Sequence, residues 1–280
     1  MENCLSGKNS EEIKQHYRKN LNLGGWFSFN STKEEWKEHF AEEMLNHFFD
    51  IELIDKAFKG FSVDSELLLT NNINFSGLKN KSVLVIGGGP STNLLTEKEI
   101  VGYDYVFSCN HFFRNTILSK VKVDVCLVGD EVDLDSKNFN NYIEKYNPAV
   151  GFEHSARRTT SDLIRFRKRY PKCFVYLTRY FSRLGFVPRA ITIASLADPK
   201  QIDYIGMDGF KSGAYTHSFE LNKAPPPFNE SERFKQQMKV FLKYILFDVK
   251  LHKDKINDLG HNHSLNIYAG MLDRIKNEEN

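Results

Sequence analysis

Three consecutive glycines after an apolar run offer a place where a phosphate group can approach the backbone. The turn comprises five residues that follow Val83–Ile86: Gly87, Gly88, Gly89, Pro90 and Ser91. Residues without a Cβ let backbone N–H groups come close to a phosphate, and the start of the next helix adds partial positive charge. Three glycines in a row are conformationally costly, so a structural turn that binds nothing is the less favoured alternative. We therefore predict a strand, a phosphate-binding turn and a helix start.

The sequence of this turn excludes some nucleotide classes. A Walker A loop requires Gly-Lys-Ser/Thr, which is missing here. A dinucleotide loop would carry a third glycine where Thr92 stands, and an acidic residue where Asn110 closes the second apolar run. A methyltransferase loop would also want that acidic residue. The turn alone predicts a nucleotide or phosphate site and no more.

Polar residues also follow the next two apolar runs. Ligands of doubly wound sheets bind beyond the carboxyl ends of the strands, so Asn110 is expected near the ligand that approaches Gly87–Gly89. Its carboxamide suits a base or a sugar hydroxyl, and a plain turn residue is the equal alternative. Asp130 and Glu131 offer two carboxylates for a metal or a base, with a solvated loop as the commoner outcome.

A later loop carries residues suited to acid/base chemistry. Asp208 follows the apolar run Ile202–Ile205, and Tyr215 and His217 come soon after. Histidine is well suited to take a hydroxyl proton near neutral pH. A tyrosine hydroxyl can stabilise a leaving phosphate without a metal. The alternative is a surface loop with an incidental histidine.

Short apolar runs alternate with helical segments over most of the chain. The runs are nearly continuous, as expected for strands covered on both faces. The expected strands are 83–86, 105–109, 123–128, 149–152, 173–177, 202–205 and 265–268. The expected helices are 93–100, 112–118, 161–169, 190–196 and a longer one starting at Asn229. This alternation predicts an α/β fold with a doubly wound, mostly parallel Rossmann-like sheet.

The beginning of the sequence has a different pattern. Glu11–Asn20 and Lys33–Phe58 place charged and aromatic residues at helical spacing, and no strand pattern occurs there. We therefore predict two regions. Residues 1–75 form a helical N-terminal extension, and residues 76–280 form a Rossmann-like nucleotide-sugar-binding domain.

Composition narrows the classes of function. The chain is 41% hydrophobic and 26% charged, which is ordinary for a globular protein. A net charge of +2 gives no case for nucleic-acid binding. No apolar stretch reaches the roughly 18 residues needed to span a bilayer. The polar start resembles no signal peptide, and four cysteines without a Cys-x-x-Cys pair indicate free thiols. We expect a cytoplasmic protein.

Four segments in this order resemble the bacterial family-42 sialyltransferases and the related motility-associated-factor group of flagellin glycosylation proteins. They are VIGGGPS at 85–91, YDYVFSCNHF at 103–112, AITIASLADPKQIDYIGMDGF at 190–210 and LNIYAG at 265–270. The resemblance implies that the glycine turn and Asn110 bind the cytidine nucleotide of a CMP-linked acidic sugar. It also implies that Asp208 belongs to the strand-end motif, that Tyr215 supports the phosphate and that His217 is the catalytic base.

The chain departs from the family pattern at three places. Phe210, without a hydroxyl, stands where the first phosphate-binding tyrosine would be. Leu184-Gly185 replaces a Ser-Gly pair that touches the donor, so Gly185 is the matching donor-binding residue. His217 comes earlier in its loop than in the sialyltransferases, which is closer to the motility-associated group.

The resemblance predicts an inverting, metal-independent glycosyltransferase with no resident cofactor. Its partners would be a nucleotide-sugar donor and a glycan or glycoconjugate acceptor. Peripheral membrane association and a homo-oligomer are compatible with the sequence. One alternative is a Mg²⁺-dependent phosphotransferase or diphosphotransferase resembling pterin diphosphokinases, with Asp130, Glu131 and Asp208 holding the metal. The other is a non-catalytic nucleotide-sugar-binding protein with residues 1–75 as its partner-binding arm.

Overall fold

The computed structural model describes most of the chain after residue 74. The described residues are 75–129, 132–153, 165–166, 168–170, 172–176, 184–195, 198–209, 217–219, 231–243, 245–246 and 251–278. The predicted helices of residues 1–75 therefore lie outside the described residues. So do Asp130, Glu131, Phe210 and Tyr215.

One sheet of parallel strands organises the described part of the chain. Its order is β5-β4-β3-β2-β1-β6-β7, and every neighbouring pair is parallel. The strands are β1 Ser82–Ile86, β2 Tyr105–Cys109, β3 Val125–Val128, β4 Ala149–Glu153, β5 Cys173–Tyr176, β6 Gln201–Ile205 and β7 Ile256–Asp258. The predicted Rossmann-like α/β class is confirmed. Because β1 pairs with β2 on one side and β6 on the other, the topological switch point lies between β1 and β6.

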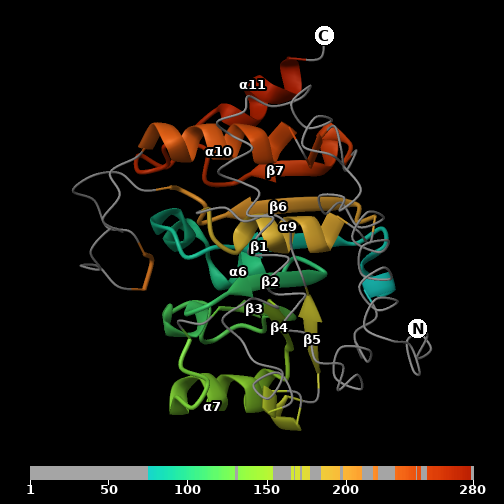
Figure 1. Cartoon of the computed structure of the whole chain (residues 1–280), viewed down its shortest axis with the longest axis vertical. Coiled ribbons are helices and arrows are strands. Elements are labelled where there is room, and N and C mark those ends of the chain that lie inside the picture. The colour runs from blue at the N-terminus through green and yellow to red at the C-terminus, as the bar shows by residue number, and fades with distance from the viewer. Residues whose placement is uncertain are drawn as a thin grey trace, which may run out of the picture.

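Helices cover both faces of this sheet. The α-helices are α6 Glu97–Ile100, α7 Lys137–Tyr146, α9 Val187–Ser195, α10 Ser231–Lys243 and α11 Met271–Asn277. The 3-10 helices are η1 Phe75–Leu78, η2 Pro90–Leu94, η3 Phe112–Arg114 and η5 Lys253–Lys255. Figure 1 shows α10 and α11 near β7 at one end of the sheet and α7 at the other. In that view α9 lies over β1 and β6, and it contacts both strands.

Alternation along each strand divides the core in two. On β1, Val83 and Val85 pack with α9, α10 and α11, whereas Leu84 and Ile86 pack with α6, η3 and α7. All four side chains are fully buried. Successive strand side chains point to opposite faces, so a strand covered on both faces must be apolar throughout. This explains why β1 shows no polar alternation.

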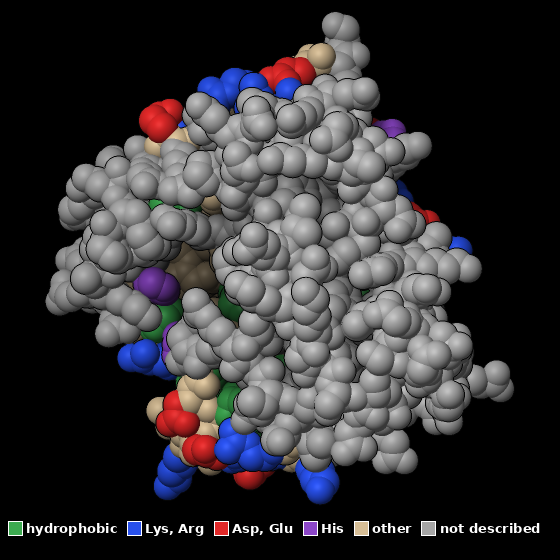
Figure 2. Space-filling view, viewed as in Figure 1, with side chains coloured by type: hydrophobic (Ala, Val, Ile, Leu, Met, Phe, Trp, Pro, Cys, Tyr) green, Lys and Arg blue, Asp and Glu red, His purple; other side chains and the backbone are tan. Residues whose placement is uncertain are grey.

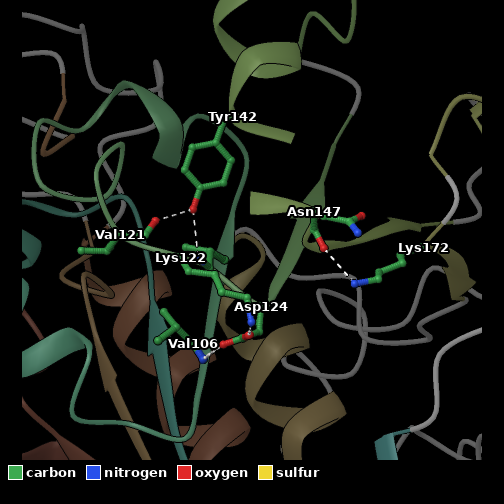
Figure 3. A network of polar contacts seen from close by, with 8 residues as sticks. Val106, Val121, Lys122, Asp124, Tyr142, Asn147 and Lys172 are labelled. Atoms are coloured by element: carbon green, nitrogen blue, oxygen red, sulfur yellow. Dashed lines mark hydrogen bonds and ion pairs between the residues drawn. The ribbon is translucent and has the colours of Figure 1, made fainter. Parts of the chain in front are cut away.

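Polar contacts fix the entry of β3 into the sheet (Figure 3). The Tyr142 hydroxyl of α7 accepts a hydrogen bond from Val123 N at 2.9 Å and donates one to Val121 O at 2.7 Å. Asp124 accepts a hydrogen bond from Val106 N of β2 at 2.9 Å. These bonds satisfy backbone groups at the point where the ladder begins. They set the register that brings the ends of β2 and β3 together.

Most predicted strands are confirmed, and one is wrong. Six of the expected runs coincide with β1 to β6 within one or two residues. The expected strand 265–268 is instead a series of turns, in which Tyr268 N donates to the Asn266 side chain at 2.8 Å. Tyr268 is buried without belonging to the sheet. The seventh strand is β7, a short and largely polar segment that hydrophobicity did not reveal.

The helix predictions succeed in part. The longer helix expected from Asn229 is α10, in which Phe234, Met238 and Phe241 are buried, as is Ile245 just after its end. The expected helix 190–196 is α9, which begins earlier, at Val187. The expected helix 93–100 is split into η2 and α6 by the extended residues Leu95 and Thr96, and Thr96 caps α6. Only a 3-10 turn occurs in 112–118, and α7 was not predicted.

Candidate functional site

A cavity opens at the switch point between β1 and β6. Its volume is about 240 Å³. On the face drawn in Figure 2, a hollow is visible whose edge carries a histidine side chain. Residues after β1, β2 and β6 line the cavity together with the start of α9, residues 217–219, α10 and the turn before α11. This is the crevice in which open α/β sheets bind ligands, beyond the carboxyl ends of the strands.

Several residues proposed from the sequence lie around this one cavity. The lining includes Gly88, Gly89, Asn110, Gly185, Asp208 and His217. Gly87, Pro90 and Ser91 belong to the same turn but stand behind the lining. Tyr215 and Phe210 lie outside the described residues, so their roles stay predictions. The cavity thus gathers residues from five separate segments of the chain.

Gly87 and Gly89 are required by the packing of β1 against β6. Gly87 N donates to Ile205 O and Gly89 N donates to Gly206 O, both at 2.8 Å. A Cβ on Gly87 would lie 2.3 Å from Gly206 O, and a Cβ on Gly89 would lie 2.3 Å from an Asp208 carboxylate oxygen. The sequence reasoning assigned these glycines to the approach of a phosphate. The structure gives a different reason, the close contact of two backbones.

Gly88 is the member of the turn that faces the cavity with room to spare. A Cβ there would make ordinary contacts, 3.5 Å from His217 Cδ2 and 3.7 Å from Phe219 Cε1. Its carbonyl accepts a hydrogen bond from Ser218 N at 2.8 Å. The predicted helix start is the short 3-10 helix η2, and Ser91 N donates to Asp208 at 2.8 Å. Any phosphate contact by this turn therefore depends on Gly88.

Asn110 is both a turn residue and part of the cavity wall. Its φ of 50° is left-handed, a conformation that asparagine tolerates better than most residues. Its side-chain oxygen accepts a hydrogen bond from Gly129 N at 2.8 Å, which joins the ends of β2 and β3. This bond holds the side chain at the end of β3 while Asn110 remains in the cavity wall. The two alternatives for Asn110, a turn residue and a residue near a ligand, are therefore compatible.

Asp208 is a buried carboxyl in the cavity wall, with 2% of its surface exposed. Oδ2 accepts the Ser91 N–H, and Ser91 Oγ accepts a hydrogen bond from Gly206 N at 2.9 Å. Burial raises the pKa of Asp208, while the hydrogen bonds from Ser91 oppose this rise. Oδ1 has no hydrogen-bond partner within the described part of the chain. A buried carboxylate oxygen without a donor is costly, which points to a ligand or a proton.

His217 lies over the glycine turn. Its ring stands 5.1 Å from the ring of Phe219, and Ser218 between them is tied to Gly88. Asn93 also donates to Ser218 O at 3.3 Å. The imidazole is half-buried and lines the cavity.

The start of α9 forms the opposite wall of the cavity. Ala190 N donates to Phe186 O, so the helix begins there and its positive end faces the lining residues Leu184–Val187. Arg189 is buried and donates to Gly185 O at 2.6 Å, with its guanidinium 5.1 Å from the Phe186 ring centre. In the structure its charge stands behind the wall.

Other lining residues were not proposed from the sequence. His111, Cys109, Phe219, Phe186, Phe234 and Tyr268 all border the cavity. His111 directly follows Asn110 after β2, so its position at a strand end was a signal that could have been used. Phe234 and Tyr268 gave no such signal, because they belong to apolar stretches that resemble core. No disulfide joins Cys109, Cys126 and Cys173 to one another.

No metal cluster or membrane span occurs in the described residues. Within these ranges no group of three or more His, Cys, Asp or Glu side chains is arranged to hold a metal ion. Asp130 and Glu131 are not among them. No described helix has both the length and the apolar character to cross a bilayer.

Of three comparisons with known proteins, the one with solved structures finds similar chains. No protein-family model matches it, and no curated protein matches it. Two similar solved structures are a mammalian sialyltransferase and a mammalian sialyltransferase in complex with Gal-beta-1-3GalNAc-ortho-nitrophenol. The first has a TM-score of 0.37 and 13% identity, over 82% of this chain and 87% of that one. The second has a TM-score of 0.40 and 14% identity, over 91% and 88%.

Proposed function

We propose that this protein is a glycosyltransferase that uses a nucleotide-activated sugar, with a CMP-linked acidic sugar as the donor. The observation that carries this proposal is the cavity at the switch point. Gly88, Asn110, Gly185, Asp208 and His217 were chosen from sequence for this chemistry, and all of them line it. They come from five segments, so their meeting is not a consequence of being neighbours in the chain.

The walls of the cavity suit such a donor. Gly88 and Asn110, after β1 and β2, would hold the nucleotide. The positive end of α9, reinforced by Arg189 behind Gly185, favours an anionic group on that side. The aromatic side chains of Phe186, Phe219 and Phe234 give the apolar surface against which a base or a sugar ring can pack.

The reaction we propose is a single displacement with inversion and without a metal. His217 would take the proton of the acceptor hydroxyl as that oxygen forms a bond to the anomeric carbon. The bond from this carbon to the phosphate oxygen breaks at the same time, and the nucleoside monophosphate leaves with the electron pair. Tyr215 would stabilise the departing phosphate.

A thermal-shift screen with nucleotides tests this function first. The ligands are CMP, CDP, UDP, GDP, ATP, NAD and S-adenosylmethionine, each with and without Mg²⁺. We expect selective stabilisation by CMP, because a ligand that binds only the folded protein raises its melting temperature. Selective stabilisation by NAD or S-adenosylmethionine would contradict the proposal. Transfer or hydrolysis of a CMP-linked sugar in the presence of EDTA then separates an enzyme from a binding protein.

A further inference from the structure

A second carboxyl lies behind the cavity wall, next to Asp208. Asp258 ends β7 and is not part of the lining. Its oxygens accept hydrogen bonds from Gly260 N at 2.9 Å and from the Asn266 side chain at 3.3 Å. Gly260 packs so closely on Ser91 that a Cβ would lie 2.8 Å from Ser91 Oγ and 3.3 Å from Asp258 Oδ1. Ser91 therefore stands between the two carboxyls, since its N–H is bound to Asp208.

The charge of Asp208 acts on Asp258 through this poorly solvated region. Burial raises the pKa of Asp258 to about 6, and the negative charge of Asp208 adds to the rise. Like charges close together in a low dielectric do not ionise independently, so the protons belong to the pair. Asp208 itself is almost completely buried, and its Oδ1 has no partner among the described residues. A proton on either carboxyl therefore removes the repulsion between two buried negative charges.

The other titratable groups around the pair do not remove this coupling. His261, whose Nδ1 lies 2.8 Å from Asp258 O, favours the ionised form of Asp258. His263 does the same for Asp208. The Tyr204 hydroxyl on β6 is fully buried, and its pKa is raised, so it stays neutral. His111 and His217 both line the cavity and are the other imidazole side chains near the ligand.

We propose that Asp258 is a positioning residue that sets the charge of the cavity wall by sharing one proton with Asp208, and that an anionic ligand binds the form of the pair that holds this proton. The reason is electrostatic. Among the described residues that line the cavity, Asp208 is the only carboxylate, and neither lysine nor arginine is present. A second negative charge directly behind Asp208 repels a phosphate or a carboxylate. The inference rests on the proposed function only in taking CMP as the ligand.

The test is the pH dependence of CMP affinity, measured by titration calorimetry between about pH 5 and about pH 7.5. In the unchanged protein, the fraction of molecules whose Asp208–Asp258 pair holds the proton, which is the form that binds CMP, falls as the pH rises. Its Kd should therefore rise by about tenfold from pH 5 to a pH one unit above the titration step. Cytidine, which has no phosphate, is the uncharged comparison ligand and should show no such change.

Two variants separate this role from a structural one. Asp258→Asn and Asp208→Asn each keep the shape and an acceptor oxygen but leave a single ionisable carboxyl. Both should flatten the profile and bind CMP about tenfold more tightly than the unchanged protein near pH 7. A purely structural role predicts weaker binding instead. Asp254→Asn, an exposed aspartate just before β7, is the matched control and should keep the original profile.

Titration of the CMP phosphate itself, near pH 6, occurs with every variant and cancels when affinities are compared at each pH. Equal pH profiles in the unchanged protein and in both Asn variants would overturn the inference. Weaker binding of CMP by both variants at every pH would also overturn the inference.

A ligand-free arm of the experiment compares the melting temperatures of the unchanged protein and of Asp258→Asn over the same pH range. The unchanged protein should lose stability relative to Asp258→Asn as pH rises toward 6, and parallel curves would overturn the coupling. Failure of CMP to bind would instead contradict the proposed function, and the ligand-free arm would still decide the inference.

Discussion

At the scale of single residues, the three glycines of the turn are not equivalent. Gly87 and Gly89 allow two backbones to touch, whereas a Cβ on Gly88 would make only ordinary contacts with His217 and Phe219. From the sequence alone, we gave all three glycines the same explanation, the approach of a phosphate. In the structure Gly87 and Gly89 are required by close backbone contacts, and Gly88 is the position that could accept a side chain.

Alanine substitutions distinguish these two roles. Gly89→Ala should lower the free energy of unfolding by about 1–3 kcal/mol, because its Cβ must displace backbone and a buried carboxyl. Gly88→Ala should leave stability nearly unchanged and weaken CMP binding, since the added methyl group enters the cavity. Denaturant unfolding and calorimetry measure the two effects. If Gly88→Ala binds CMP as well as the unchanged protein, the turn does not contact the nucleotide.

The role of His217 is tested by removing its imidazole. His217→Ala should lower turnover by roughly 10²–10⁴-fold with little change in CMP affinity, as expected when a general base is lost. His252→Ala, at an exposed histidine outside the cavity, should leave both quantities unchanged. Turnover assays with saturating donor give the comparison. Unchanged turnover in His217→Ala would remove this residue from the mechanism.

At the scale of elements, the sequence predicts best where local pattern and environment agree. β1 to β6 were visible because parallel strands buried on both faces are short and apolar. β7 was hidden because only Ile256 of its three residues is fully buried. The segment 265–268 was wrongly predicted as a strand because it is apolar without belonging to the sheet. Its apolar residues pack into the core from a turn whose N–H groups bind side chains and the Asp208 carbonyl instead of a neighbouring strand.

The same logic explains which parts of the site were found. Asn110 and Asp208 are polar residues directly after apolar strands, a position that a parallel sheet turns into a ligand edge. Phe234 and Tyr268 reach the cavity through the docking of α10 and of the final turn, which no local pattern encodes. Asp258 was missed along with its strand.

α10 offers a prediction at this scale. Phe241 of this helix is fully buried, whereas Lys239 is exposed. Phe241→Ala should destabilise the protein by about 3–5 kcal/mol through the cavity that it leaves. Lys239→Ala should change stability by less than about 0.5 kcal/mol. Urea unfolding of both variants tests whether α10 is part of the core, and similar small losses would contradict this.

At the scale of the whole molecule, Asp258 makes stability depend on pH with a defined sign. A carboxyl whose pKa is raised to about 6 binds its proton more tightly in the folded than in the unfolded protein. Its contribution is therefore present at low pH and is lost as pH rises from about 4 to about 6, by up to about 3 kcal/mol. Asp104 acts in the opposite direction at lower pH, because hydrogen bonds from Ser82 and Lys81 lower its pKa to about 2.

Equilibrium unfolding at a series of pH values checks this balance. The unchanged protein should lose stability between about pH 4 and about pH 6. Asp258→Asn should lose less over the same interval, because the substituted side chain does not titrate. A loss of the same size in both proteins would assign the pH dependence to other groups.

The hydrogen bond between Ser91 and Asp208 spans 117 positions of the chain. The two residues come together only when β6 pairs with β1, and β6 follows β2 to β5 in the sequence. The cavity is therefore incomplete in a chain whose β6 has not yet been synthesised or has not yet paired. A nucleotide would then bind only those chains in which the whole sheet has formed, and bound nucleotide would be a measure of complete folding.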